Sequence, residues 1–282
     1  MILPTVAYPA INPIALKLGP FSVRWYGLAY LVGFTVAGLV MHWLVKRWDV
    51  HLSEDDQLTV VLASVIGLIV GGRLGYVMVY GGGYYWTHPA SILAIWDGGM
   101  SFHGGLAGVL FAGWVVSRMV RVPFLTLADM GAVGAPVGLF FGRIANFIND
   151  ELWGRTTTVP WGVVFPGAGP LPRHPSQLYE ALLEGIVLFA VMLWFATRSP
   201  RQPRGVILGW LLTLYAVFRI FVEFFRQPDI QMGSGGFFAG WVTTGMLLSL
   251  PVFAAGVGLI VWAHRAQLPE SGHAEKAEPR ER

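Results

Sequence analysis

The chain has 282 residues, of which 55% are hydrophobic and only 12% are charged; because soluble domains usually carry about 25% charged residues, this composition excludes an ordinary soluble domain and indicates an integral membrane protein. The net charge of +3 is spread over short polar segments, which argues against nucleic-acid binding. The sequence contains no cysteine, so this chain supplies neither a disulfide, nor a thiolate metal ligand, nor a cysteine nucleophile.

Seven hydrophobic segments follow one another along the chain, most of them close to the roughly 20 residues that cross a bilayer. The third is short, and residues 87–100 before it are predicted to form a re-entrant or interfacial segment. Pro136 is expected to kink the fourth. The first residues lack a basic region and are interrupted by prolines, so no cleavable signal peptide is expected. The segments span approximately residues 23–45, 58–80, 102–116, 127–148, 177–196, 206–225 and 238–262.

Lysines and arginines outside these segments predict the orientation in the membrane, because such residues accumulate on the cytoplasmic side. The sequence thus predicts an all-α membrane protein, a bundle of seven transmembrane helices with a periplasmic N-terminus and a cytoplasmic C-terminus. Residues 1–265 are expected to form a single transmembrane domain, and residues 266–282 a polar cytoplasmic tail that is disordered. Eleven basic residues are assigned to the cytoplasm (Lys46, Arg47, Arg118, Arg121, Arg198, Arg201, Arg204, Arg265, Lys276, Arg280 and Arg282) and four to the periplasm (Lys17, Arg155, Arg173 and Arg226).

With this topology, the polar residues of the spans fall at one depth, in the outer half of the bilayer. An arginine at the centre of a membrane helix costs roughly 2.5 to 3.5 kcal/mol, so residues kept there are expected to serve a function. Their clustering predicts one site near the outer leaflet. The residues concerned are Arg24, Tyr26, Arg73, His103, Arg143, Asn146, Glu151, Gln177, Glu180 and Arg219.

Glycines recur every fourth residue in two of the spans. The second span contains Gly67, Gly71 and Gly75, and the fourth contains a similar triplet at residues 134, 138 and 142. Small residues at this spacing let two helix backbones approach closely. Both triplets are therefore predicted to form tight helix–helix contacts.

Residues 142–155, at the end of the fourth span and in the loop after it, are rich in polar side chains. Arg143 and Asn146 are three residues apart, so they share a helix face. The planar guanidinium grips a phosphate group at two points, although an arginine near a helix end also reaches the membrane surface without binding a ligand. Glu151 and Arg155 follow in the outer loop and are expected to pair or to orient the site. Gly154 is expected to turn the chain sharply.

The sixth span carries a second arginine. Arg219 and Glu223 are four residues apart, a spacing that allows an ion pair within one helix. Tyr215 lies one turn earlier on the same face. The pair either neutralises itself or directs Arg219 towards a phosphate that Arg143 also contacts.

Two further residues fit a reacting centre. His103 is followed by Gly104 and Gly105, which let a ligand approach the imidazole closely, and histidine accepts a proton near neutral pH. The alternative is an interfacial histidine bonded to backbone or water. Tyr26 is either part of the site or a member of the aromatic belt at the membrane surface.

The fifth span presents Gln177, Glu180 and Glu184 on one face. Paired carboxylates serve acid–base chemistry, but the interpretation favoured here is that they compensate the charge of the arginines. Glu184 is the deeper of the two carboxylates and needs a partner, for which an arginine is expected. Arg73, in the second span, is expected to pair with one of these carboxylates.

Several long motifs, in the same order along the chain, resemble those of the prolipoprotein diacylglyceryl transferase family. Two positions depart from the family pattern: Ala145 stands where glycine is usual, and residues 243–246 read Thr-Thr-Gly-Met where many members read Ser-Met-Gly-Gln, so no role for that glutamine is carried over. The resemblance extends from about Tyr26 to Trp262. The matching motifs are residues 25–27, 97–105, 142–155, 173–180 and 218–229.

The resemblance implies a transferase of the bacterial inner (cytoplasmic) membrane that catalyses the first step of lipoprotein maturation. Such an enzyme moves the diacylglyceryl group of phosphatidylglycerol to the lipobox cysteine thiol of a prolipoprotein, which follows the apolar part of its signal peptide. A thioether forms and glycerol phosphate leaves. The implied partners are phosphatidylglycerol, the prolipoprotein signal peptide and membrane lipid, with no cofactor and no metal.

The resemblance also implies roles for individual residues. His103 is the candidate base, although the thiol proton has alternative acceptors in water and the departing phosphate. Glu151 is expected to hold an arginine in place, and Glu223 to keep Arg219 aimed. The implied catalytic residues are His103, Arg143, Arg219, Tyr26 and Glu151. The implied substrate-binding residues are Arg143, Asn146, Arg219, Gly154, Tyr215 and Glu223.

Two other classes of membrane protein fit the sequence less well. A transporter or flippase for an anionic lipid or solute would place ionisable residues through both leaflets, whereas the inner half of these spans is almost bare of them. An intramembrane protease would need a serine–histidine dyad or two aspartates within the spans. Ser234 is assigned to a loop, and no such aspartate pair is present in the sequence.

Overall fold

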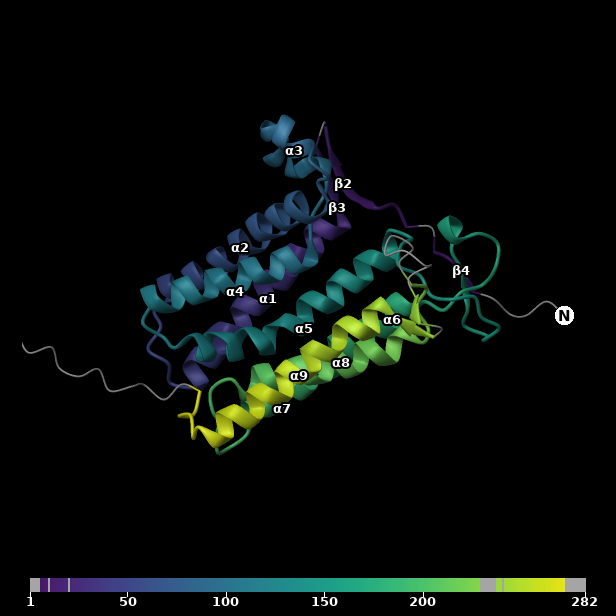
Figure 1. Cartoon of the computed structure of the whole chain (residues 1–282). Helices are drawn as coiled ribbons and strands as arrows, with labels where there is room; N and C mark the ends of the chain where they lie inside the picture. Colours follow the sequence, from purple (N-terminus) through teal and green to yellow (C-terminus); the bar gives the residue numbers. More distant parts are fainter. Residues whose placement is uncertain (1–5, 10, 20, 229–236, 240, 272–282) are drawn as a thin grey trace, which may run out of the picture. The chain divides into compact units, whose positions relative to one another are not determined.

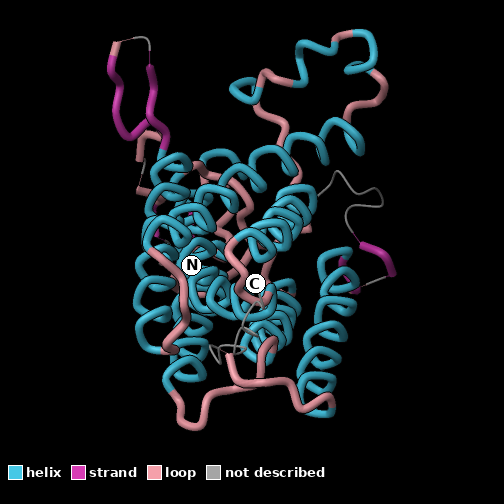
Figure 2. Tube along the Cα trace, turned by 90° about the vertical axis from the view of Figure 1, so that its left-hand side faces the viewer, coloured by secondary structure: helices cyan, strands magenta, loops and turns pink. Residues whose placement is uncertain are grey.

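The computed structural model describes residues 6–9, 11–19, 21–228, 237–239 and 241–271, and most of these are helical (Figures 1 and 2). Ser234 and the predicted tail from residue 272 onward lie outside the described residues. Contacts within the chain divide it into two compact units. The first unit comprises Met1–Val40 and Asp129–Ser271, and the second comprises Met41–Ala128 and Gly272–Arg282.

The second unit is built on two helices, α2 (Glu54–Tyr80) and α4 (Phe102–Met119), which lie side by side (Figure 1). The chain between them forms a short helix, α3 (Tyr84–Thr87), and two 3-10 turns at Pro89–Ile92 and Ile95–Asp97. The sequence predicted a re-entrant or interfacial segment at residues 87–100, and these short turns are what the chain forms there.

The two helices of the second unit approach each other through glycines on both sides. A Cβ atom added to Gly75 would lie 2.7 Å from the Cα atom of Gly104, and one on Gly71 would lie 2.7 Å from the Cα atom of Gly108. Gly67 meets the backbone of Gly108 in the same way. No side chain fits between backbones at this separation, so the tight contact predicted for this triplet is confirmed.

The first unit contains the other long helices. Helix α1 (Trp25–Arg47) lies in it as far as Val40, and α5 (Phe124–Ile148) lies in it from Asp129 onward. The next span begins as α6 and continues without a break through a π-helical segment into α7, while α8 and α9 pack along each other (Figure 1). Their bounds are α6 Ser176–Glu180, the π-helical segment Ala181–Val187, α7 Leu188–Thr197, α8 Val206–Glu223 and α9 Thr244–Arg265.

The second glycine triplet packs in part. A Cβ atom on Gly134 would lie 3.0 Å from the Cβ atom of Ala37 in α1, and one on Gly33 would lie 3.1 Å from the Cα atom of Gly138. Among the described residues, nothing lies within 4 Å of a Cβ atom placed on Gly142. The prediction of tight packing therefore holds for α1 against the middle of α5 and is wrong at Gly142.

The described part of the first unit also contains short strands, which the sequence did not predict; three precede α1 and three lie between later helices. The first of them leads to Tyr8, whose hydroxyl oxygen lies 2.9 Å from the carbonyl oxygen of Phe147 and 2.7 Å from that of Ile148. These are carbonyls that the last turn of a helix leaves without a partner inside the helix. The strands are β1 (Val6–Ala7) parallel to β4 (Val163–Val164), β2 (Ile14–Leu18) antiparallel to β3 (Phe21–Arg24), and β5 (Phe237–Ala239) antiparallel to β6 (Val242–Thr243).

Six helices in the described part of the chain are long and apolar enough to cross a membrane, which supports a multi-pass membrane protein. The sequence predicted seven spans. The third of these, residues 102–116, corresponds to α4, which is helical over 18 residues but is not among the six. The reason is its composition: His103 and Arg118 occupy its two ends, and four glycines interrupt its apolar face.

A buried aspartate joins three segments at one end of the first unit. Asp129 of α5 accepts hydrogen bonds of 2.8 Å from the backbone N–H groups of Gly205 and Leu208, at the start of α8. Its carboxylate also accepts a 2.6 Å hydrogen bond from the hydroxyl of Ser271. The backbone N–H of Ser271 donates to Gln202, so the part of the predicted tail that is described, residues 266–271, ends in hydrogen bonds to the first unit.

Candidate active site

The charged residues of the candidate site lie in the first unit and come from α5, from the helix that begins with α6, and from α8. Arg143 of α5 forms two ion pairs, from Nε to Glu180 Oε2 at 3.3 Å and from Nη2 to Glu184 Oε2 at 3.2 Å. Both carboxylates are fully buried, whereas the arginine side chain remains 17% exposed. The expectation that Glu184 finds an arginine partner is confirmed.

Glu180 joins the two arginines that the sequence singled out. Its second oxygen, Oε1, lies 2.7 Å from Nη1 of Arg219, which is 13% exposed. One buried carboxylate thus contacts the guanidinium of Arg143 on one side and that of Arg219 on the other. Because Glu180 itself is fully buried, this bridge fixes the two guanidinium groups close together.

Glu223 extends the same network along α8. It forms an ion pair with Nη2 of Arg219, which confirms the predicted pairing at four residues' separation. Its other oxygen accepts a 2.7 Å hydrogen bond from the hydroxyl of Thr243, and Nη1 of Arg226 lies 3.4 Å from Oε1. Glu223 is therefore held from three directions and keeps Arg219 in a fixed orientation.

The network balances three buried glutamates against three arginines, as groups removed from water require. Each guanidinium has five N–H donors. In the described part of the chain, the pairs of Arg143 use Nε and Nη2, and those of Arg219 use Nη1 and Nη2. Donors therefore remain on both groups for a ligand. Tyr215 lies one turn before Arg219 on α8.

A second polar cluster lies beside this network. The hydroxyl of Tyr26 donates to Oε1 of Glu151, and Nδ2 of Asn146 lies 2.9 Å from the same oxygen and also contacts the Tyr26 hydroxyl. The three residues come from α1, α5 and the loop after α5. Glu151 was expected to hold an arginine in place; in the structure its carboxylate instead binds the tyrosine and the asparagine.

The loop that carries Glu151 is shaped by its backbone. Asp150 and Leu152 both have positive φ angles, 55° and 56°. The start of α6 then fixes the loop, because the hydroxyl of Ser176 donates to the carbonyl of Leu152 at 3.0 Å and Nε2 of Gln177 donates to the carbonyl of Glu151 at 2.6 Å. Gln177 is buried together with Glu180 and Glu184, as the shared helix face predicted, but its anchoring of the loop has no signal in the sequence.

Gly154 lies where three backbones converge. Its N–H donates to the carbonyl of His174 at 2.9 Å, and an added Cβ atom would lie 2.5 Å from that oxygen and 2.6 Å from the carbonyl oxygen of Phe225. The sharp turn that was predicted at Gly154 occurs instead at residues 150–152, and Gly154 is needed for this close approach.

Burial lowers the pKa of the neighbouring His174, which favours its neutral form. Arg155 donates from Nε to the carbonyl of Arg226 at 3.0 Å.

His103 belongs to the second unit. It occupies the first turn of α4, which Ser101 caps by accepting a 3.2 Å hydrogen bond from the N–H of Gly104. The imidazole is exposed on this unit and contacts the ring of Phe102 edge-on, with 5.6 Å between ring centroids. Its proposed action on a substrate held by residues of the first unit stays a prediction.

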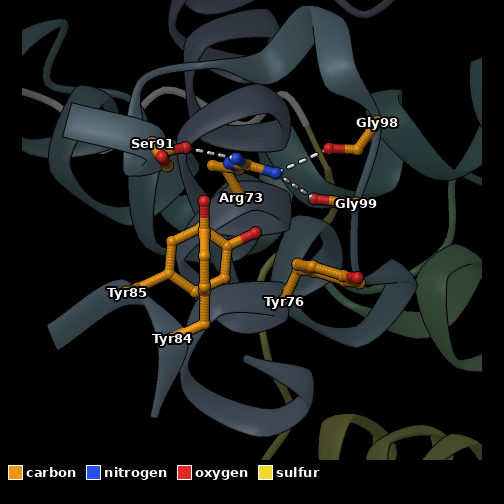
Figure 3. Close-up of a pocket in the computed structure, with 7 residues that line it drawn as sticks. All are labelled: Arg73, Tyr76, Tyr84, Tyr85, Ser91, Gly98 and Gly99. Atoms are coloured by element: carbon orange, nitrogen blue, oxygen red, sulfur yellow. Dashed lines mark hydrogen bonds between the residues drawn. The ribbon is translucent and has the colours of Figure 1, made fainter. Parts of the chain in front are cut away.

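Arg73, also in the second unit, has partners that the sequence did not predict (Figure 3). Instead of a carboxylate, its guanidinium binds four backbone carbonyls, those of Ser91 (2.5 Å), Ile92 (2.8 Å), Gly98 (2.6 Å) and Gly99 (3.1 Å). The rings of Tyr76 and Tyr85 lie against the guanidinium at 5.9 and 5.3 Å. Arg73 is thus a clamp on the segment between α2 and α4, and the expectation of an ion pair is wrong.

Among the residues that the structure describes, no group of three or more histidine, aspartate or glutamate side chains is placed to hold a metal ion. The side chains gathered at the site are arginines, carboxylates, an asparagine amide and a tyrosine hydroxyl. Two arginines fixed at a short separation suit a phosphate group, which accepts hydrogen bonds from guanidinium groups in pairs.

Among known protein families, the one that matches this chain has members whose names include a phosphate-containing lipid. The family model for prolipoprotein diacylglyceryl transferase matches residues 13–262. The chain belongs to this family. A relative from Nitratidesulfovibrio vulgaris (strain Miyazaki F) is 50% identical over 264 residues, covering 91% of this chain and 95% of the relative. Relatives from Geobacter sulfurreducens and Coxiella burnetii are each 47% identical, covering 93% and 92% of this chain and 98% and 97% of their own lengths.

All three relatives are named phosphatidylglycerol–prolipoprotein diacylglyceryl transferase. Two places in the sequence depart from the usual pattern of this family, and their surroundings in the structure differ. Ala145 is buried in α5. Thr243 takes part in the site, because its hydroxyl binds Glu223 and also accepts a 3.2 Å hydrogen bond from the N–H of Met246 at the start of α9.

Proposed function

We propose that this membrane protein, a transferase of lipoprotein biosynthesis, moves the diacylglyceryl group of phosphatidylglycerol to a prolipoprotein at the Arg143–Arg219 pair. The observation that carries the proposal is the bridge formed by Glu180, which sets two partly exposed guanidinium groups side by side. The donor lipid has one phosphate, and that phosphate must be held while its bond to the diacylglyceryl group breaks. Membership of the family and the names of the relatives support the same substrates.

The acceptor is the lipobox cysteine thiol of the prolipoprotein. Its sulfur attacks the sn-3 carbon of the lipid, so a carbon–sulfur bond forms while the bond between that carbon and the phosphate oxygen breaks. Glycerol phosphate leaves with the negative charge that develops on this oxygen. Arg143 and Arg219 stabilise this charge by charge-assisted hydrogen bonds, which count most where they strengthen as the transition state forms.

The headgroup is oriented by the cluster of Tyr26, Asn146 and Glu151. These side chains bind one another, so their positions are set before a ligand arrives. Preorganised donors and acceptors do not have to reorganise during the reaction. Glu151 contributes an acceptor for the headgroup and fixes the tyrosine and the asparagine. Gly154 and Tyr215 shape the same substrate-binding region.

The thiol must lose a proton. A free cysteine has a pKa of about 8.5, so only a few per cent is thiolate at neutral pH. His103 is the proposed base, and such assistance is typically worth about 10² to 10⁴ in rate. The alternative acceptor is the departing phosphate, which gains basicity as its ester bond breaks. In either case the proton leaves the sulfur as the thioether forms.

The topology proposed for this reaction has seven spans, with α4 as the third, a periplasmic N-terminus and a cytoplasmic C-terminus in the bacterial inner membrane. The excess of lysine and arginine on the predicted cytoplasmic side supports this orientation. In this orientation Arg143 and Arg219 lie in the outer half of the bilayer. A signal peptide keeps its basic end in the cytoplasm, so its lipobox reaches the same depth.

The proposal is tested by the transfer of label from phosphatidylglycerol, labelled in its diacylglyceryl part, to a lipobox peptide by the purified protein. We expect transfer that requires the thiol and is absent with a peptide in which serine replaces cysteine. Arg143→Lys, which keeps the charge but loses the planar fork, should lower transfer by about 10²-fold. Transfer by His103→Gln at the wild-type rate would reject His103 as the base, and no transfer by folded wild-type protein would reject the proposed function.

A further inference from the structure

Gln177 has one end of its side-chain amide occupied and the other end free. The side chain is fully buried, and its Nε2 donates a 2.6 Å hydrogen bond to the carbonyl of Glu151. Among the described residues, its Oε1 has no hydrogen-bond partner. Buried polar atoms are nearly always paired, so an unpaired acceptor in this position calls for a ligand or another explanation.

The orientation of this amide is set by its surroundings. The oxygen and nitrogen of a glutamine side chain are assigned from the hydrogen bonds that each of them makes. Turning the amide by half a turn would place Oε1 against the carbonyl oxygen of Glu151, and two acceptors would then face each other. The nitrogen therefore stays on Glu151, and the free end is an oxygen, which only accepts hydrogen bonds.

Gln177 is connected to both parts of the candidate site, the arginine–glutamate network and the cluster around Glu151. Three residues further along the helix is Glu180, the carboxylate that bridges Arg143 and Arg219. Residues three apart on a helix lie on the same face. On its other side, Gln177 binds the backbone of Glu151, whose carboxylate holds the headgroup-orienting cluster. Gln177 thus lies one helical turn from Glu180, which holds the two arginines, and its amide contacts the backbone of Glu151, one of the residues proposed to orient the headgroup.

We propose that Oε1 of Gln177 accepts a hydrogen bond from a hydroxyl of the headgroup glycerol and thereby selects a polyol headgroup. The proposal rests on the proposed function and adds the recognition of the donor lipid to it. Beyond its phosphate, phosphatidylglycerol ends in three carbons with two hydroxyl groups. A hydroxyl supplies the donor that the free oxygen lacks.

The neutral character of Gln177 suits a hydroxyl better than an ammonium group. A charged headgroup that enters a buried site loses far more hydration than a hydroxyl does, and a single neutral oxygen does not replace that hydration. A headgroup without any donor would leave Oε1 unpaired. Oε1 of Gln177 therefore disfavours both an ammonium headgroup and a headgroup without a donor. Selectivity comes from this discrimination as well as from the hydrogen bond to the hydroxyl.

Glu184 is the competing candidate, because its Oε1 is also buried and without a hydrogen-bond partner among the described residues. It lies seven residues beyond Gln177, two turns deeper along the same helix. Its other oxygen pairs with Arg143, so it belongs to the part of the site that holds the phosphate. The headgroup glycerol extends from the phosphate towards the membrane surface, on the side where Gln177 lies in the proposed topology.

The test compares two donor lipids with the same acyl chains and the same phosphate. One is phosphatidylglycerol, and the other is phosphatidylpropanol, whose headgroup has three carbons but neither hydroxyl. The kcat/KM for transfer to a lipobox peptide is measured for both donors with the wild type, Gln177→Met, Ser176→Ala and Glu184→Gln. Ser176 is the matched structural control, because it is buried and binds the same loop through the carbonyl of Leu152.

We expect the wild type to prefer phosphatidylglycerol by about 10-fold or more, the discrimination that a buried hydrogen-bonding group gives against a ligand that leaves it unpaired. Gln177→Met should lose this preference by losing activity on phosphatidylglycerol, while its kcat/KM on phosphatidylpropanol changes much less. Ser176→Ala should affect both donors by the same factor and keep the preference.

Three results would overturn the assignment. The first is a wild type that uses both donors equally, and the second is a Gln177→Met variant in which activity on both falls by one factor, which would leave Gln177 only its loop-anchoring role. The third is loss of the preference in Glu184→Gln while Gln177 variants keep it. If Gln177→Met does not fold, Gln177→Asn, which keeps the amide but withdraws it by one methylene, replaces it. A wild type that transfers from neither lipid would reject the proposed function itself, a result distinct from all three.

Discussion

Glu180 illustrates how much one residue can determine in this site. Its two oxygens contact two arginines on different helices, and the side chain is fully buried. A buried ion pair adds little net stability by itself, because removing the charges from water offsets their attraction. Breaking such a pair has a large effect, since it leaves an uncompensated buried charge. The main effect of the bridge is therefore to position Arg143 and Arg219, and not to add net stability.

We expect Glu180→Gln to lower both the stability and the activity of the protein. The amide nitrogen that replaces one oxygen is a donor, and it would face the N–H groups of one of the two arginines. The expected loss of stability is about 3 to 5 kcal/mol, measured as thermal or denaturant unfolding in detergent. Transfer to a lipobox peptide should fall with it.

The control for Glu180→Gln is Glu54→Gln, because Glu54 is exposed in the first turn of α2. Its loss should change stability by no more than a few tenths of a kcal/mol, since only its interaction with the helix dipole is removed. Equal unfolding curves for Glu180→Gln and the wild type would show that the bridge does not fix the arginines.

At the residue scale, the sequence predicted contacts that depend on local spacing better than contacts that depend on loops. The pairing of Arg219 with Glu223 follows from four residues on a helix, and it is confirmed. The partners of Arg73 are four carbonyls of a non-repetitive segment, whose path is not encoded in a periodic pattern. For the same reason the binding of Glu151 by Tyr26 and Asn146 was missed, because three separate segments bring these residues together.

At the scale of elements, glycines decide how closely helices pack. We expect Gly71→Ala to destabilise the second unit, because the added methyl group would meet the backbone of α4 at Gly104 and Gly108, which has no flexible end that can move aside. Overpacking of this kind typically costs about 1 to 3 kcal/mol. The measurement is the unfolding midpoint in detergent, together with the yield of folded protein.

The matched control for this substitution is Gly258→Ala in α9. In the described residues, nothing lies within 4 Å of a Cβ atom placed on Gly258. Alanine is the better helix former by about 1 kcal/mol, so this variant should be unchanged or more stable. If both variants were equally destabilised, the close contact of α2 and α4 would not be the cause.

Asp129 connects elements that are far apart in the sequence. Its carboxylate caps the N-terminus of α8 from another helix and also binds Ser271 near the end of the described chain. We expect Asp129→Ala to lose at least the roughly 1 to 2 kcal/mol that a capping side chain contributes, because two buried N–H groups are left without a partner. The loss should appear as a lower midpoint of thermal unfolding in detergent.

Ser271→Ala separates the two contributions of Asp129. It removes one hydrogen bond and leaves the cap of α8 in place, so its effect should be smaller, about 1 kcal/mol. Limited proteolysis should then cut the chain after Arg265 more readily than in the wild type, because residues 266–271 lose one of their attachments to the first unit. A Ser271→Ala variant as unstable as Asp129→Ala would contradict this division.

Elements with a strong hydrophobic signal were predicted well, and those without one were not. The bounds of α2, α5 and α8 differ from those of the predicted spans by no more than four residues at either end. The π-helical segment Ala181–Val187 has no comparable signature, and neither do the two-residue strands β1, β4 and β6, which are too short to show alternation. The turn at Asp150 and Leu152 was assigned to Gly154 instead, because glycine is the usual residue for such turns.

At the scale of the whole molecule, the prediction that is still to be tested is the path of α4 through the membrane. In the part of the chain that the structure describes, six helices reach the length and apolarity of a span, and α4 is not among them. A helix with polar ends and several glycines can nevertheless cross a bilayer when it packs tightly against another span, which shields its backbone. The contact of α4 with α2 provides such shielding, and an odd number of spans places the two chain ends on opposite sides.

The absence of cysteine in the sequence makes this question directly measurable, because single cysteines can be introduced without background. Thr87→Cys lies before α4 and Met119→Cys at its end, and both positions are exposed. If α4 crosses the membrane, a membrane-impermeant maleimide should label residue 87 in intact spheroplasts and residue 119 only after permeabilisation. Labelling of both positions in intact spheroplasts would mean that α4 re-enters on the same side, and the proposed orientation of all later helices, with Arg143 and Arg219 among them, would then be reversed.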